Sequence, residues 1–178
     1  ITCGGTIDKD YPRATSGYAF EFGDEPAANR ILTRAQPLAV VVDVKCPFQK
    51  DSTEITDEDR VVLRALLDTA HMRVIITHGT DTMIDTARFL HAHAVHRGQS
   101  VVLTGAMRPE RFTESDAHFN LGVAMGAVQL LPAGAYVCMN GRVVAAHLAR
   151  RDMDDGRFHS DGTGMAPHVA AFVPESKP

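Results

Sequence analysis

The sequence lacks the features of several specialised protein classes. Its 178 residues include no Trp and only three Cys, and these form no C-x-x-C pair and have no His at metal-ligand spacing. No run of about 18 apolar residues could form a membrane span, and no signal-peptide core opens the chain. A disulfide scaffold, a zinc ribbon and a membrane protein are therefore excluded. We interpret Cys3, Cys46 and Cys138 as buried thiols in a reducing compartment, and we expect a cytoplasmic protein.

Neither acidic nor basic residues are in large excess. The chain carries 18 Lys and Arg against 22 Asp and Glu, a formal net charge of -4 at pH 7. Because no basic stripe is present, nucleic acid and anionic membranes are poor candidates for a partner, and a small molecule is a better one. The apolar share of 44% is ordinary for a globular protein. On a prior of about 150 residues per domain, we expect residues 1–178 to form a single domain.

Short β-branched runs alternate with segments of helical period, which is typical of an α/β protein. We expect strands at residues 38–44, 73–77, 100–104 and 135–139. These runs are apolar throughout, as strands are when helices cover both faces of a sheet. The pattern therefore predicts a Rossmann-like or flavodoxin-like domain with a mostly parallel sheet.

Helix signals lie between these strands. Thr56, with Asp59 three positions later, resembles a capping box and predicts a helix that ends near His71. Two further helices are expected at residues 82–97, before a left-handed C-cap at Gly98, and at residues 116–131. The remaining expectations are a long loop suited to a lid at 9–24, a loop at 150–161 and an edge strand at 168–173.

Small hydroxyl and carboxylate residues follow the expected strands. They lie in the segments 4–8, 50–53, 78–82 and 105–109. Ligands bind beyond the carboxyl ends of the strands in an open α/β sheet, so the four loops together predict one site. The sequence has no G-x-G-x-x-G and no Walker motif, which argues against a nucleotide cofactor.

Each of these motifs also has a purely structural interpretation. Gly4 and Gly5 let the backbone approach a ligand or present N–H groups as an oxyanion hole, but they equally suit a tight turn. Thr80 and Asp81 open a helix where an anion could bind, yet either side chain could simply cap that helix. His78 lies within the same motif, although nothing in the sequence makes it a catalytic base.

Taken together, the motifs resemble those of the bacterial L-asparaginases. The matching runs are Gly-Gly-Thr-Ile at 4–7, Thr-His-Gly-Thr-Asp-Thr-Met at 77–83 and Leu-Thr-Gly-Ala-Met-Arg-Pro at 103–109. Asp-Ser at 51–52, Ser-Asp at 115–116, Phe-Asn-Leu at 119–121 and Met-Asn at 139–140 continue the resemblance in order. The chain is most similar to the short, single-domain form of that family. The resemblance implies hydrolysis of L-asparagine, with L-glutamine as a lesser substrate, by a homo-oligomer that uses no metal or organic cofactor.

The resemblance also implies roles for individual residues. Thr6 would be the nucleophile that forms an acyl-enzyme, and Thr80 would act with Asp81, which also holds the substrate α-amino group. A tyrosine on the first loop would accept the Thr6 proton; spacing leaves Tyr11 and Tyr18 open, and we favour Tyr11 because it is nearer to Thr6. The residues expected to line the substrate pocket are Asp51, Ser52, Thr53, Gly79, Ala106 and Tyr18.

One position departs from the family pattern. Where the family carries a lysine after the Met-Asn strand end, this chain has Arg151, next to Arg150. Arginine can pair with Asp81 but stays protonated, so Arg151 cannot accept a proton as a lysine can. Two alternatives therefore stay open: a non-enzymatic amino-acid binding or regulatory module, and an amidase that acts on a larger amide substrate.

Overall fold

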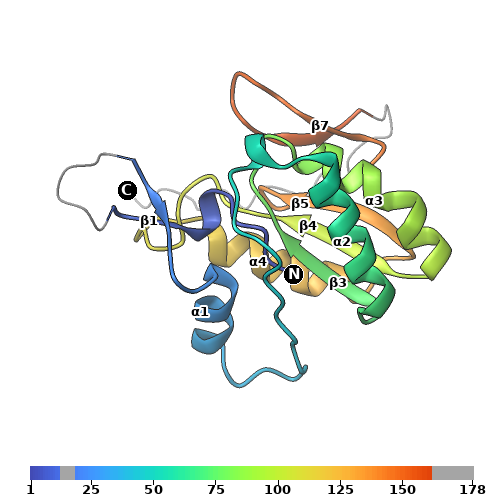
Figure 1. Cartoon of the computed structure of the whole chain (residues 1–178), viewed down its shortest axis with the longest axis horizontal. Helices are drawn as coiled ribbons and strands as arrows, with labels where there is room; N and C mark the ends of the chain where they lie inside the picture. The colour runs from blue at the N-terminus through green and yellow to red at the C-terminus, as the bar shows by residue number, and fades with distance from the viewer. Residues whose placement is uncertain (13–18, 162–178) are drawn as a thin grey trace, which may run out of the picture.

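A four-stranded sheet with helices on both faces forms the centre of the molecule (Figure 1). The computed structural model describes residues 1–12 and 19–161. The sheet order is β3-β4-β5-β6; the first three strands pair in parallel and β6 is antiparallel to β5. The strands are β3 (Arg73–Thr77), β4 (Ser100–Thr104), β5 (Gly134–Met139) and β6 (Arg142–Ala145). The carboxyl ends of β3 and β4 therefore meet at one edge, where the 78–82 and 105–109 loops begin.

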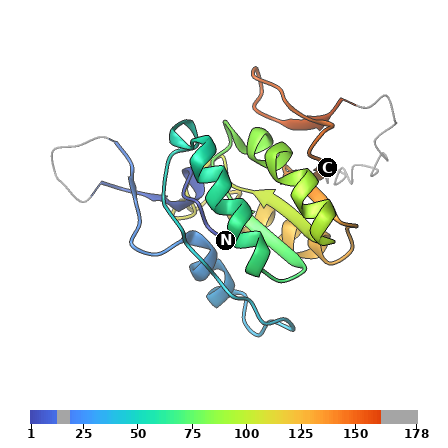
Figure 2. The ribbon, with the colours of Figure 1, turned by 45° about the vertical axis from the view of Figure 1, so that its right-hand side comes forward.

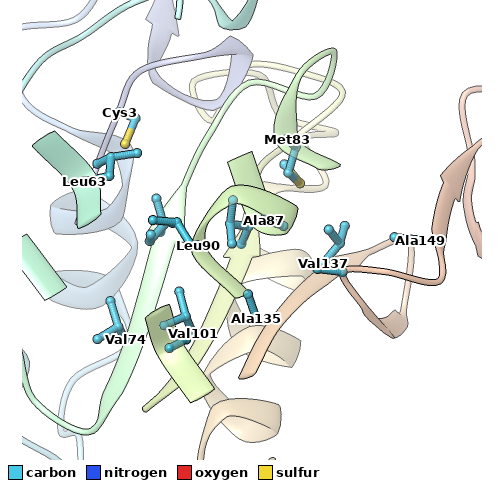
Figure 3. Close-up of a cluster of buried hydrophobic side chains, with 14 of the residues drawn as sticks. Cys3, Leu63, Val74, Met83, Ala87, Leu90, Val101, Ala135, Val137 and Ala149 are labelled. Atoms are coloured by element: carbon cyan, nitrogen blue, oxygen red, sulfur yellow. The ribbon is translucent and has the colours of Figure 1, made fainter. Parts of the chain in front are cut away.

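The helices divide between the two faces of this sheet (Figure 2). They are α1 (Ala27–Arg34), α2 (Asp57–Thr69), α3 (Met83–Arg97) and α4 (Ala117–Val128). On one face, Leu63 of α2 and Leu90 of α3 pack with Val101 of β4 in the main apolar core (Figure 3). On the other face, α4 packs on Val102 and Cys138, and α1 packs against α4. The predicted α/β class, with helices on both faces, is confirmed.

Local signals explain where two of the helices begin and end. The Thr56 hydroxyl accepts the Asp59 N–H at 3.3 Å, and an Asp59 carboxylate oxygen accepts the Thr56 N–H at 2.9 Å. This capping box starts α2, as predicted. Gly98 ends α3 with a φ of 68°, a left-handed conformation that glycine adopts without steric cost. The 73–77 and 100–104 strands also have the predicted bounds.

The prediction of a strand at residues 38–44 is wrong. This segment forms no strand in the described part of the chain, and Val41 is fully exposed beside an apolar cavity of about 390 Å³. The reason is that residues 1–5 take the place next to β3: the Cys3 N–H donates to the Thr77 carbonyl at 3.0 Å. On the other side of residues 1–5, the Thr2 N–H donates to the Lys45 carbonyl at 2.8 Å and the Lys50 N–H donates to the Cys3 carbonyl at 3.0 Å, so these bonds begin only after residue 44.

Other predictions also need correction. The 9–24 segment contains a two-stranded pairing, and the loop expected at 150–161 contains most of an antiparallel hairpin. These strands are β1 (Lys9–Asp10), β2 (Glu21–Phe22), β7 (Ala149–Arg151) and β8 (Phe158–Ser160). Cys46 is exposed rather than buried, whereas Cys3 and Cys138 are buried. The expected edge strand at 168–173 lies outside the described residues.

Two classes of feature are absent from the described ranges. None of the helices within 1–12 and 19–161 combines the length and apolar character that crossing a bilayer requires. Within the same ranges, no three His, Cys, Asp or Glu side chains are grouped so that they could hold a metal ion.

Candidate active site

Glycine contacts bring three of the predicted loops together. A Cβ atom added to Gly5 would lie 2.4 Å from the Cα of Gly79, and one added to Gly79 would lie 2.6 Å from the Cβ of Ser52. Real Cβ atoms do not approach other atoms this closely, so only glycine allows these backbones to touch. Thr6 follows Gly5 and Thr80 follows Gly79. The two threonines therefore lie at the same place in the fold, although 74 positions separate them in the sequence.

The Thr6 loop turns tightly at this point. Thr6–Asp8 form a single 3₁₀ turn after Gly5, whose φ of 79° is left-handed. Lys9 follows the turn directly and has an extended backbone. Its Nζ donates to Asp51 Oδ2 at 2.6 Å, and this contact holds the pKa of the Asp51 carboxyl below its usual value. Lys9 thus ties the Thr6 loop to the Asp51 and Ser52 loop.

Ser52 and Arg151 fix the carboxylate of Asp81. The Asp81 N–H donates to Ser52 Oγ at 3.2 Å, and Ser52 Oγ lies 3.4 Å from Asp81 Oδ2. The other carboxylate oxygen, Oδ1, accepts from Arg151 Nη1 at 2.6 Å. Because α3 begins after Thr82 and no side chain caps it, neither Thr80 nor Asp81 serves as its cap. The interpretation of Thr80 or Asp81 as the side-chain cap of this helix is therefore wrong.

Arg151 reaches the site from the β7–β8 hairpin. It pairs in register with Phe158, and its guanidinium carbon lies 5.8 Å from the centroid of that ring. Arg151 Nε is buried and has no hydrogen-bond partner among the described residues. Arg150 points elsewhere and forms an ion pair with Asp161 at 2.7 Å. Of the two neighbouring arginines, Arg151 is the one that faces Asp81.

The loop after β4 forms the wall beside Thr6. Ala106 is buried in an apolar cluster with Ile7, the residue next to Thr6. The Asp116 carboxylate accepts the Met107 N–H at 3.0 Å, and Asn120 Nδ2 donates to the Gly105 carbonyl at 3.0 Å. These bonds from the start of α4 set the path of the loop and place Ala106 against the Thr6 turn.

Asp8, the carboxylate of the predicted 4–8 segment, is fully buried and was assigned no role of its own from the sequence. Its Oδ1 accepts the Ala27 N–H at 2.6 Å and so holds the first turn of α1. Burial raises the pKa of the Asp8 carboxyl to about 6. Asp8 therefore joins the Thr6 turn to α1, a helix that the sequence did not predict.

Two predicted residues lie in other surroundings. Tyr11 is 63% exposed, and its ring stacks on Phe112 at 5.4 Å and meets the edge of Phe20 at 5.9 Å. Thr53 is exposed, and its hydroxyl donates to Asp51 Oδ1 at 3.0 Å. Tyr18 lies outside the described residues. Tyr11 is thus part of a three-ring aromatic cluster near the β1–β2 pair.

His78 is buried at the end of β3, where the 78–82 loop begins. Its Nδ1 lies 2.8 Å from the Gly79 carbonyl oxygen, and its Nε2 lies 3.0 Å from Thr86 Oγ1. Burial lowers the pKa of His78 to about 4, so the ring is neutral near pH 7. The structure places this residue behind the Thr80 loop.

Comparison with known proteins adds a family to this geometry. Residues 1–159 match the family model described as "Asparaginase, N-terminal". The chain is 30% identical to the glutaminase-asparaginase of Acinetobacter glutaminasificans, over 97% of this chain and 51% of that protein. It is 29% identical to an L-asparaginase of Bacillus licheniformis, over 85% of this chain and 48% of that protein.

A solved structure shows the same fold. The thermostable L-asparaginase from Thermococcus kodakarensis superposes with a TM-score of 0.74 at 24% identity, over 89% of this chain and 49% of that one. At this identity the likeness concerns the fold. The chain spans about half the length of the two curated relatives and of this structure.

Proposed function

Because the chain belongs to the asparaginase family, we propose that it hydrolyses the side-chain amide of L-asparagine to L-aspartate and ammonia. The observation that carries the proposal is the contact of Gly5 with Gly79, which brings Thr6 and Thr80 to one place beside the Asp81–Arg151 pair. The name of the Bacillus licheniformis relative, an L-asparaginase, supports this choice of substrate.

Thr6 is the nucleophile of the proposed reaction. Its Oγ attacks the amide carbon, a C–O bond forms, and the hydroxyl proton passes to Tyr11, which acts either as the phenolate or as a relay that passes its own phenolic proton to another base. Collapse of the tetrahedral intermediate breaks the C–N bond, and the leaving amine takes a proton and departs as ammonia. Water then hydrolyses the ester on Thr6, which returns the hydroxyl and releases aspartate. The Gly4–Gly5 turn, considered in the sequence as an oxyanion hole, has no such role in this scheme, because the Gly5 N–H donates to the Lys50 carbonyl at 2.9 Å and the Gly4 N–H bonds to the Asp8 carboxylate.

Asp81 and the loops around it hold the rest of the substrate. The Asp81 carboxylate takes the α-ammonium group, and Ser52 adds a donor and an acceptor beside it. Asp51, Thr53, Gly79 and Ala106 complete the pocket. L-glutamine, one methylene longer, is a lesser substrate in this proposal, and the name of the Acinetobacter relative, a glutaminase-asparaginase, supports including it.

Arg151 serves as a fixed cation in this scheme. A guanidinium stays protonated over the working pH range, so Arg151 orients Asp81 and takes no proton from the reaction. The Thr6 proton therefore needs another acceptor, and Tyr11 is assigned that role because it is the loop tyrosine nearer to Thr6 in the sequence.

Ammonia release tests the proposal. We expect the intact protein to release ammonia from L-asparagine, and Thr6→Ala to lower the rate at least about a thousandfold. Thr33→Ala, on the exposed side of α1, is the matched control and keeps full activity. If the intact protein binds L-aspartate but releases no ammonia, the amino-acid binding module is the correct alternative. Hydrolysis of larger amides in preference to L-asparagine would favour the second alternative, an amidase that acts on a larger amide substrate.

Two expectations about the whole protein remain predictions. We expect a homo-oligomer, which light scattering of the purified protein measures directly. We also expect a cytoplasmic location, which fractionation of cells that express the natural protein would determine.

A further inference from the structure

A chain of buried hydrogen bonds leads from α2 to the Thr80 loop. Arg60 Nε lies 3.1 Å from Thr86 Oγ1, which lies 3.0 Å from His78 Nε2. The other ring nitrogen, Nδ1, lies 2.8 Å from the Gly79 carbonyl oxygen. His78 and Thr86 are both fully buried, so water does not substitute for these partners.

The chemistry of the end groups fixes the direction of every bond in this chain. A carbonyl oxygen only accepts, so His78 Nδ1 carries a proton and donates it to Gly79. In the neutral ring Nε2 then has a lone pair and accepts the Thr86 hydroxyl proton. Arg60 only donates, so Thr86 Oγ1 accepts from it. The chain therefore selects one tautomer of His78, with the proton on Nδ1.

The last acceptor in this series of hydrogen bonds, the Gly79 carbonyl, belongs to the candidate site. The Gly79 carbonyl is part of the peptide group that joins Gly79 to Thr80, so its direction sets the position of the Thr80 backbone. Packing confines Gly79 on another side, since an added Cβ would lie 2.6 Å from Ser52 Cβ. His78 thus supplies a hydrogen bond that holds this peptide in addition to the packing around Gly79.

We propose that His78, Thr86 and Arg60 are positioning residues that orient the Gly79–Thr80 peptide for catalysis, with His78 in its neutral Nδ1–H form. This proposal rests on the proposed function, because it assigns these residues to the Thr80 half of that site. None of them touches substrate in it; Arg60 and Thr86 act through His78, and His78 acts through the Gly79 carbonyl.

The electrostatic surroundings favour the neutral ring. Desolvation is the largest cause of the lowered pKa of His78, and Arg60 of α2 is the charged group that adds to it. Arg60 is itself paired with Asp57 at 2.7 Å. A protonated ring would turn an Nε2–H toward Thr86 Oγ1, which already accepts from Arg60. Protonation therefore removes the acceptor that Nε2 offers to the Thr86 hydroxyl, whereas Nδ1–H still donates to the Gly79 carbonyl.

Thr86→Val is the variant that tests this chain, because valine has the shape of threonine without the hydroxyl. His78 Nε2 then loses its donor, and we expect kcat to fall about tenfold with KM changed less than about threefold. Thr86→Ser keeps the hydroxyl and is expected to restore kcat to within about twofold. Arg60→Gln provides a second test on a partly exposed residue, with a smaller loss of kcat expected.

Nuclear magnetic resonance reads the tautomer without reference to activity. We expect the ring ¹⁵N signals of His78 to show the Nδ1–H form from pH 5 to 8. The Thr80 amide signal should shift in Thr86→Val and return in Thr86→Ser. The Nε2–H form in the intact protein, or an unshifted Thr80 amide in Thr86→Val, would overturn the proposal. If the intact protein releases no ammonia, the proposed function fails, and these two signals still decide whether the chain orients the peptide.

Discussion

The two threonine halves of the site differ in how firmly they are held. Around Thr80, Ser52 and Arg151 fix both oxygens of Asp81, and His78 holds the Gly79 carbonyl. Around Thr6, Lys9 bonds to Asp51, whereas Tyr11 is 63% exposed and stacks on the Phe112 ring. The Thr80 half is preorganised by buried groups, and the residue proposed to take the Thr6 proton is on the surface.

This difference indicates a division of labour between the halves. Binding and orientation need fixed groups, because each ångström of misplacement weakens the interactions that lower the barrier. Proton transfer needs a group that comes within hydrogen-bond reach of Thr6 when substrate is bound. The predictions below test whether the Thr80 half is the rigid one and whether Tyr11 serves the other.

After the loss already expected for Thr6→Ala, removal of the Thr80 hydroxyl should have the largest effect. We expect Thr80→Ala to lower kcat/KM about a thousandfold, since the half that holds the substrate loses its hydroxyl. Thr80→Ser should retain activity to within about tenfold. Ammonia release under identical conditions measures both. Near-normal activity of Thr80→Ala would show that this half binds without contributing to the chemistry.

Loss of the Tyr11 hydroxyl should come next. Tyr11→Phe keeps the ring for packing on Phe112 and removes the proton acceptor, and we expect kcat to fall about a hundredfold. Tyr136→Phe is the matched control; its hydroxyl donates to the Pro132 carbonyl at 3.1 Å, and activity should be unchanged. A hundredfold loss in Tyr18→Phe instead would assign the role to the other loop tyrosine.

The Arg151 ion pair should have an intermediate effect. Asp81 is about half exposed, so loss of its partner costs less than it would in the interior. We expect Arg151→Met to lower kcat/KM about tenfold and Arg151→Lys to retain most of it, because lysine keeps the charge. Arg150→Met removes a neighbouring arginine of the same strand and should change the rate less than about twofold. Equal losses in the two methionine variants would indicate damage to the hairpin rather than loss of the Asp81 contact.

The smallest effect concerns stability and pH. Asp8 has a pKa of about 6 in the fold against 3.8 when unfolded, so the native state binds its proton more tightly and this contribution to stability is lost as pH rises to about 6. The pKa of His78 is about 4 in the fold against 6.5 when unfolded. Its effect has the opposite sign, because stability rises with pH between these two values. The two slopes oppose each other in the natural sequence.

Asp8→Asn should leave the pH dependence of stability that comes from His78 unopposed. Asparagine keeps an acceptor for the Ala27 N–H, and we expect stability to gain about 1 kcal/mol at pH 7 and to rise with pH between 4 and 6.5. Denaturant unfolding at a series of pH values measures this. A pH profile identical to that of the natural sequence would mean that the pKa of Asp8 does not differ between the folded and unfolded states.

The sequence predicted the parts of the fold whose signals are local. Buried apolar runs defined 73–77 and 100–104, and the Thr56 capping box defined the start of α2. Residues 38–44 have strand composition but no partner, because residues 1–5 occupy the edge of β3. The start of α1 was not predictable from its own residues, since its acceptor, Asp8, lies 19 positions away.

The candidate site likewise has parts that local motifs predicted and parts that they did not. Motifs after β3 and β4 identified the loops, and counting along the family pattern identified Arg151 opposite Asp81. The chain from Arg60 through Thr86 to His78 was not predictable, because helical phase and the approach of α2 to α3 bring those side chains together. The residues next to each of these positions in the sequence do not indicate that the three side chains meet.

A crystal structure of the protein with L-aspartate bound tests the central claim most directly. The account predicts that the side-chain carboxylate of the product lies within about 3 Å of both Thr6 Oγ1 and Thr80 Oγ1, with the α-ammonium group on Asp81. Aspartate bound away from the two threonines, or reaching only one of them, would contradict the claim that both hydroxyls serve one scissile amide.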